Sequence, residues 1–171
     1  MVVANLKPGD VFTIPLGDGR CGLGQAVTAS PQDSVYMVVF DAILDDESEP
    51  VDLADLVATA SIRLAAWAGS VLVEIGRWKV LGNVPAREDF PRPAFKVAID
   101  RPGNYYVEDW DMTRRRPATP EEAVRLPLRH SFSAAAVELA LKGDLGLEPW
   151  IENFDVMRLS GPTTQEMFGD D

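Results

Sequence analysis

The chain has 171 residues, of which 46% are hydrophobic, and its 27 acidic and 16 basic residues give a formal net charge of −11. This length suits one well-filled core, and the negative charge disfavours unaided binding to nucleic acid or to anionic lipid. The most apolar stretch, Leu64–Val73, is short against the about 20 residues that a transmembrane helix needs, so we expect no membrane span.

The cysteine content and the first residues favour the cytoplasm. Cys21 is the one cysteine in the chain, so it cannot form an internal disulfide. Asn5 and Lys7 interrupt the apolar start within a few residues, which is unlike a secretory leader.

The first predicted element is a β-hairpin. An apolar run from Val11 to Leu16 precedes the turn Gly17-Asp18-Gly19, and residues 23–28 read as the second strand. The same glycines, with Gly22, match G-x-G-x-x-G. A phosphate-binding loop would have to open a helix, and Asp18 would repel phosphate, so we interpret these glycines as turn residues.

A buried strand and a helix follow the hairpin. The β-branched and aromatic run Val35–Phe40 predicts a third strand that continues through Leu44. The polar residues Asp45–Glu49 predict a loop, and Pro50 suits the first turn of a helix beginning near Val51. Ser61–Trp67 fits either an extension of that helix or a strand, and periodicity leaves both open.

The middle of the chain is predicted to be mostly strand. Residues 77–83 alternate polar and large apolar side chains, which predicts a strand that ends in a glycine turn. Prolines keep residues 84–93 extended on the surface. A turn at Pro102-Gly103-Asn104 predicts a hairpin from Phe95 to Trp110.

Helical signals mark the last third. Thr119 can cap a short helix that ends near Leu126, and Ser131 can cap a longer one that ends near Lys142. Residues 149–159 predict a final strand around Phe154. We therefore expect an α+β fold, with a mainly antiparallel β-sheet or partly open barrel and two to three short helices packed on it. We expect residues 1–160 to form a single domain and residues 161–171 to form an acidic, partly disordered tail.

Negative charge is concentrated in one segment. No lysine or arginine occurs between Arg20 and Arg63, and a local acidic field attracts a basic partner. The predicted partner-binding residues are the acids of this segment from the end of the third strand onward, namely Asp41, Asp45, Asp46, Glu47, Glu49, Asp52 and Asp55. The competing interpretation of the segment is a solubilising face.

No pattern of catalytic or metal-binding residues stands out. One histidine and one cysteine cannot supply a zinc site, and the Asp45–Glu49 run lacks the spacing of a calcium loop. His130 and Ser131 are neighbours without a nucleophile elbow. We predict no catalytic residue, cofactor or metal. The alternatives are a small hydrolase or ligand-binding protein with a cleft near Asp109, Trp110 and Arg114, and a structural protein that assembles with itself.

A series of motifs in order resembles the immunity protein 26 family. The series is GDVFTIPL, GDGRCGLGQAV, the strand end VVFD, GRWKVLGNVP with EDFPRP, and ATPEEA, and it runs from about Lys7 to about Val124. The resemblance favours a strand for Ser61–Trp67 and places the Trp78 strand at the sheet centre. Cys21 and Leu23 depart from the aromatic character expected of relatives.

The resemblance also implies a function. The family is associated with bacterial polymorphic toxin systems, in which a cytoplasmic antidote binds a cognate toxin without catalysis. A soluble acidic domain suits a binder of basic proteins, and nuclease toxins are commonly basic because they approach phosphates. The resemblance therefore implies a protein toxin as partner, neither nucleic acid nor membrane, and leaves the oligomeric state open.

Overall fold

The computed structural model describes residues 5–30 and 34–170. The fold is α+β, as predicted, with a six-stranded mixed sheet, a separate three-stranded sheet and several short helices. The sheet is not closed into a barrel. Close contacts divide the chain into two compact units: unit 1 comprises residues 1–90 and 131–158, and unit 2 comprises residues 91–130 and 159–171.

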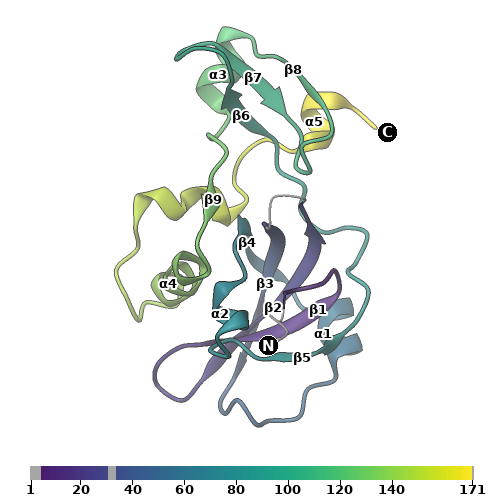
Figure 1. Ribbon diagram of the computed structural model, residues 1–171, viewed down its shortest axis with the longest axis vertical. Helices are drawn as coiled ribbons and strands as arrows, with labels where there is room; N and C mark the ends of the chain where they lie inside the picture. Colours follow the sequence, from purple (N-terminus) through teal and green to yellow (C-terminus); the bar gives the residue numbers. More distant parts are fainter. Residues whose placement is uncertain (1–4, 31–33, 171) are drawn as a thin grey trace. The chain divides into compact units, whose positions relative to one another are not determined.

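Unit 1 is built on the six-stranded sheet, whose strand order is β5-β1-β2-β3-β4-β9 (Figure 1). The strands are β1 (Asp10–Pro15), β2 (Cys21–Ala29), β3 (Val35–Leu44), β4 (Ile62–Ala68), β5 (Val80–Asn83) and β9 (Ser131–Phe132). Neighbours run antiparallel except β4 and β9. The predicted first hairpin and the long third strand are confirmed, and Ser61–Trp67 falls largely in strand β4.

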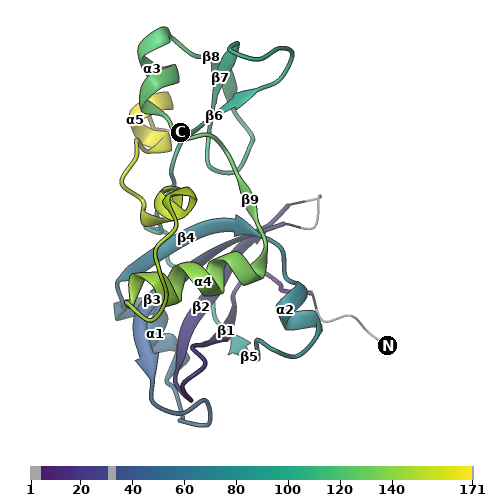
Figure 2. The same cartoon turned by 90° about the vertical axis from the view of Figure 1, so that its left-hand side faces the viewer.

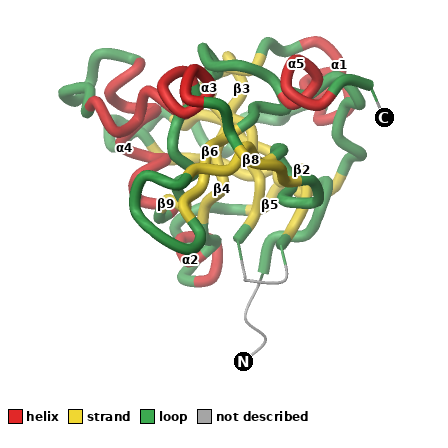
Figure 3. The backbone as a smooth tube through the Cα atoms, turned by 90° about the horizontal axis from the view of Figure 1, so that it is seen from above, coloured by secondary structure: helices red, strands yellow, loops and turns green. Residues whose placement is uncertain are grey.

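The two faces of this sheet are covered by different helices (Figures 2 and 3). Phe12 and Ile14 share one buried cluster with Val137 and Leu141 of α4 (Ala134–Asp144). The helix α2 (Val71–Glu74) and the 3₁₀ helix η1 (Glu152–Arg158) add to the same cluster. Because side chains alternate along a strand, the intervening residues face the other side, where α1 (Leu53–Thr59) lies.

The glycine-rich strand β2 lets other groups approach its backbone. Gly17 and Gly19 take positive φ in the turn, as predicted. A Cβ on Gly22 would lie 2.5 Å from Leu141 Cδ2, and one on Gly24 would lie 2.7 Å from the ring of Phe12. Gly22 therefore seats a leucine of α4 against the sheet.

A buried carboxylate joins α4 to the rest of unit 1. Glu138 is 5% exposed and accepts hydrogen bonds from Trp78 Nε1 (3.2 Å), Arg77 Nη2 (2.5 Å) and Lys142 Nζ (2.9 Å). Burial alone would raise the pKa of Glu138, but these donors lower it to about 2. The ring of Trp78 stacks on Phe12 at 5.2 Å. Helix α4, the connection between α2 and β5, and strand β1 are thus held together at one point.

Three sequence predictions in unit 1 are wrong. The Trp78 strand is not central: β5 begins at Val80 and forms an edge of the sheet, and Trp78 is buried from the connection before it. The final strand around Phe154 is η1, because Phe154 and Met157, three residues apart, are buried on the same side of a 3₁₀ helix. The N-cap of α4 is Ser133, not Ser131, and Ser131 begins β9.

Unit 2 is a smaller sheet with two capped helices. Its antiparallel strands are β6 (Phe95–Ala98), β7 (Tyr105–Glu108) and β8 (Arg115–Pro117). The predicted hairpin is confirmed as β6 and β7, whereas β8 was not predicted. The helices α3 (Pro120–Arg125) and α5 (Thr164–Phe168) both begin with capping boxes, of which the one at Thr119 was predicted. Residues 161–171, expected to be a tail, include α5.

We predict that Glu138→Ala lowers the free energy of unfolding by about 3 kcal/mol, because it leaves three donors around an empty buried site. Urea denaturation measures this loss. The matched control is Glu148→Ala, which removes an exposed carboxylate and is expected to change the free energy by less than about 0.5 kcal/mol. Equal effects of the two substitutions would show that the Glu138 cluster does not hold α4.

The same carboxylate predicts a pH dependence. Its pKa of about 2 in the folded chain lies below the ordinary value of 4.5, so the ionised group stabilises the fold fully above about pH 4.5 and less as the pH falls towards 2. We expect the stability of the native chain to decline more steeply through this window than that of Glu138→Gln, by about 3 kcal/mol in total. If the native chain and Glu138→Gln lost stability equally between pH 4.5 and pH 2, the lowered pKa assigned to Glu138 would be wrong.

Candidate functional site

The predicted partner-binding acids lie on one continuous stretch of unit 1. Residues 41–55, here called the acidic segment, comprise the end of β3, the loop after it and the first turn of α1. Glu47 is half-buried, and the other six predicted acids are exposed: Asp41, Asp45, Asp46, Glu49, Asp52 and Asp55. The structure therefore presents most of the predicted carboxylates to solvent.

The loop of the acidic segment is anchored to the sheet through Glu47. The buried hydroxyl of Thr13 in β1 donates to Glu47 Oε1 (3.0 Å) and accepts from the backbone N–H of Lys79 (3.2 Å). Lys79 Nζ lies 2.5 Å from Glu47 Oε2. The hydrogen bond from Lys79 is the main reason that the pKa of Glu47 is lowered. Glu47 is thus an anchor of the loop.

The other acids divide into paired and unpaired groups. Asp41 forms an ion pair with Arg63 at 2.6 Å. Among the residues that the structure describes, no salt bridge joins a cation to the remaining acids, which are Asp45, Asp46, Glu49, Asp52 and Asp55. These five carboxylates keep their charge available to a partner.

Local hydrogen bonds shape the loop around those charges. Glu49 Oε2 accepts from the backbone N–H of Asp45 (2.9 Å), and Asp46 accepts from the N–H of Ser48 (2.7 Å) and from its hydroxyl. Asp52 caps α1 by accepting from the N–H of Asp55 (3.0 Å). Local hydrogen bonds therefore define the turn that carries these charges.

The excess negative charge of the chain belongs to unit 1. Unit 1 contains 18 acidic and 8 basic residues, whereas unit 2 contains 9 acidic and 8 basic residues. The field that attracts a cationic partner therefore originates from unit 1.

An open groove of about 670 Å³ adjoins the anchored loop. Its walls come from the β1–β2 turn and from the α2–β5 connection, and the lining residues are Pro15, Gly17, Gly19, Arg20, Cys21, Glu47, Ile75, Gly76, Arg77 and Lys79. Each of its three cations has a carboxylate partner, at 2.6 Å for Arg20–Asp18 and 2.5 Å for Arg77–Glu138 and Lys79–Glu47. The charge of each groove cation is therefore balanced by a neighbouring acid.

The cysteine in the groove wall is a packed thiol. Burial, and then the negative charges of Glu47 and Asp46, raise the pKa of Cys21. A raised pKa keeps the sulfur protonated and weakly nucleophilic. Cys21 therefore serves as a packing residue of the fold.

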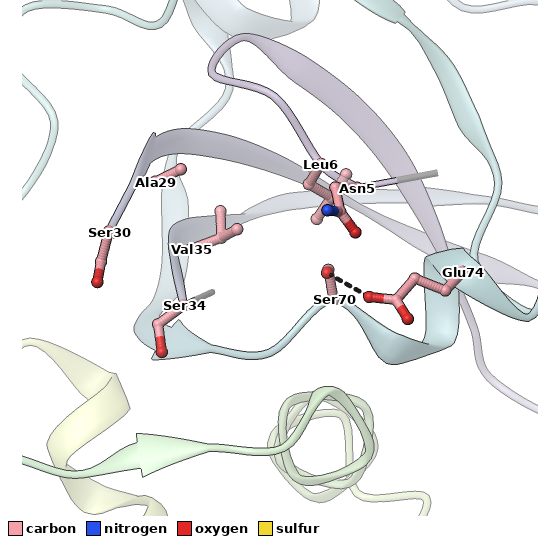
Figure 4. Close-up of a pocket in the computed structure, with 8 residues that line it drawn as sticks. All are labelled: Asn5, Leu6, Ala29, Ser30, Ser34, Val35, Ser70 and Glu74. Atoms are coloured by element: carbon pink, nitrogen blue, oxygen red, sulfur yellow. Dashed lines mark hydrogen bonds between the residues drawn. The ribbon is translucent and has the colours of Figure 1, made fainter. Parts of the chain in front are cut away.

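A second pocket, of about 220 Å³, lies between the ends of β2 and β3 and the helix α2. Figure 4 shows Ser70 donating to Glu74, at 3.1 Å, with Asn5 and Ser34 on the surrounding walls. The described residues that line this pocket include no histidine or lysine to activate the Ser70 hydroxyl as a nucleophile. We interpret this pocket as a polar recess of the fold.

The carboxylates near the predicted alternative cleft are engaged in ion pairs. Asp109 is 1% exposed; burial would raise its pKa, but hydrogen bonds from Arg114 and Thr113 lower it. Glu108 bridges Arg115 and Arg129, each at 2.5 Å. A general acid at neutral pH needs a raised pKa, so the shift of Asp109 is in the opposite direction.

The described ranges of the chain are residues 5–30 and 34–170. No group of three or more histidine, cysteine, aspartate or glutamate residues in them is arranged to hold a metal ion. No helix within these ranges is long and apolar enough to cross a bilayer.

The groove was not predicted from the sequence. Its walls are far apart in sequence, and they meet where β5 pairs with β1 and where Lys79 pairs with Glu47. The opposite charges of these two residues were visible, but 27 acids and 16 bases offer many such pairs. The sequence also shows the apolar run Val71–Val73 with Ile75, but it does not indicate which of these side chains are exposed to solvent.

Comparison with known proteins gives one match. A family model described as Immunity protein 26 matches residues 7–106, which include strands β1 to β6, the acidic segment and the groove. No curated protein and no solved structure matches the chain. The helix α4, with Glu138, lies beyond the matched residues.

We predict that Thr13→Val lowers the free energy of unfolding by about 1 to 2 kcal/mol, because it leaves the Lys79 N–H without its acceptor and frees the Glu47 loop. Hydrogen exchange should show faster exchange at Lys79 and across residues 45–49. Thr28→Val in β2 is the control, since its hydroxyl makes no hydrogen bond within the described chain. If the Thr13 variant left exchange in the loop unchanged, the anchoring role of Glu47 would be wrong.

Proposed function

The chain belongs to the immunity protein 26 family, and from this we propose that it neutralises a cognate bacterial toxin by binding it in the cytoplasm. The observation that carries the proposal is the family match over residues 7–106, more than half of the chain. Protection by binding requires a complementary surface and no chemical step.

The charge of unit 1 supports a basic partner. With 18 acidic and 8 basic residues, unit 1 repels polyanions and attracts cationic proteins. Enzymes that cut nucleic acid need a positive surface to approach phosphates. We therefore propose a basic nuclease as the toxin class and the acidic segment as the surface that meets it.

The geometry of the acidic segment supports a steering role. Asp45, Asp46 and Glu49 are exposed without cation partners, while Glu47 and local hydrogen bonds hold the loop in one shape. Charges fixed in advance attract a partner without an ordering cost on binding. Exposed charges accelerate association more than they strengthen a formed complex.

The proposed protection needs no chemical step by this chain. The buried carboxylates Glu108, Asp109 and Glu138 are all hydrogen-bonded to arginine side chains. Their arrangement supports structural roles and agrees with a protein that acts by binding alone.

The test compares two triple variants against the protein encoded by the adjacent gene. We expect Asp45→Asn, Asp46→Asn and Glu49→Gln together to lower the association rate about tenfold at low salt and less at moderate salt. These amides keep the acceptor oxygens that shape the loop. Stopped-flow or surface binding measures the rates, and growth of cells that express both proteins measures protection.

The matched control removes three exposed charges elsewhere, with Glu121→Gln, Glu148→Gln and Glu152→Gln. It should alter the association rate by less than about twofold. If both triple variants slow association equally, only the net charge matters and the acidic segment is not the contact surface. If the native chain neither binds the neighbouring product nor protects cells, the proposed function is wrong.

A further inference from the structure

Unit 1 exposes a group of large apolar side chains beside the acidic loop. Four such residues, from α2, its C-cap and β5, are here called the apolar ridge and retain high exposed fractions: Val71 48%, Ile75 68%, Val80 43% and Leu81 38%. They fall within residues 71–81, although unit 1 has a large core that could have taken them. Four exposed apolar side chains within eleven residues make this segment a candidate interaction site.

The local structure holds the ridge outward. Leu72 and Val73 of α2 are buried, which directs Val71 and Ile75, one helical turn apart, to solvent. Gly76, at φ 75°, ends the turn, and the next residue, Arg77, is fixed by Glu138 at 2.5 Å. Ile75 therefore lies between two anchored elements and does not need to be ordered by a partner.

The ridge and the acidic loop meet in one groove. Ile75 and Glu47 both line the 670 Å³ groove, and Lys79, the residue before β5, pairs with Glu47. The three groove cations have carboxylate partners, and the unpaired acids Asp45, Asp46 and Glu49 belong to the same loop as Glu47. An apolar centre with a charged rim is the usual anatomy of a protein interface.

The form of β5 favours docking through side chains. This edge strand is only four residues long, and its pairing with β1 is interrupted between Val11 and Phe12. Short and irregular edges disfavour the addition of another strand. A partner is therefore expected to contact Ile75 and Val80 rather than to extend the sheet.

We infer that the apolar ridge, centred on Ile75 and Val80, is the anchor that holds the toxin after the acidic loop has steered it into contact. The occupant is a basic protein surface with an apolar patch at its middle. This inference rests on the proposed function and adds to it a second surface with a different kinetic role. A few well-packed apolar residues carry most of the energy of a typical interface.

The double variant Ile75→Ser and Val80→Ser tests the inference against the product of the adjacent gene. Because neither substitution changes charge, the association rate should stay within about twofold. The dissociation rate should rise at least about tenfold, since the anchor is lost. The triple amide variant of the acidic loop should show the opposite pattern.

The matched control is Leu147→Ser with Ile151→Ser, which alters two apolar residues of unit 1 that are 41% and 47% exposed. It should leave both rates unchanged. Thermal unfolding checks that the variants fold. Hydrogen exchange of the native chain gives a second readout, in which residues 71–81 should become protected in the complex.

Three outcomes would overturn the inference. An unchanged dissociation rate in the ridge variant, with no protection of residues 71–81, would remove the anchor while leaving toxin binding intact. A native chain that dimerises through the ridge, and binds the toxin equally well when the ridge is altered, would make the ridge a self-association surface. Failure of the native chain to bind would refute the proposed function together with the inference.

Discussion

Glu138 accepts hydrogen bonds from Trp78, Arg77 and Lys142 inside unit 1, and much of the candidate binding surface depends on this contact. A lone carboxylate in a core is costly, but one with three donors is stable as the anion. The cluster fixes the connection from α2 to β5, which presents Ile75 and Lys79. It also attaches α4, which lies beyond the family-matched residues, to the matched sheet.

A second polar contact, centred on Thr13, holds the other side of the groove. Thr13 is buried in β1, and its hydroxyl joins the backbone of Lys79 to Glu47. One acid of the segment is thereby used for structure, which leaves its neighbours exposed in fixed positions. The two anchors explain how a segment with so much like charge can keep a defined shape.

The two halves of the candidate surface differ in physical role. Unpaired carboxylates act over about 8 to 10 Å through solvent and weaken as salt increases. Exposed apolar side chains act only in contact and are largely insensitive to salt. A protein that must capture a toxin quickly and retain it benefits from both, and the groove brings Glu47 and Ile75 to one place.

Much of the fold could be predicted from local sequence signals. The turn glycines, the β-branched run of β3 and the capping box at Thr119 act within a few residues, so their outcomes agreed with the structure. Errors occurred where burial decided the outcome. The sequence 149–159 contains strand-forming residues, but Phe154 and Met157 bury together only in a 3₁₀ turn. Trp78 is a core residue without being part of a central strand.

By itself, the sequence determined the α+β class, the acidic segment and the motif order that places the chain in its family, because composition and short-range patterns encode each of these. Only the tertiary structure decided which acids are free and which are anchors, and it alone revealed the groove and the exposed side of α2. Glu47 and Lys79, and likewise Arg77 and Glu138, are separated by tens of residues. The choice among many possible charge pairs depends on how the whole core packs, which no local pattern specifies.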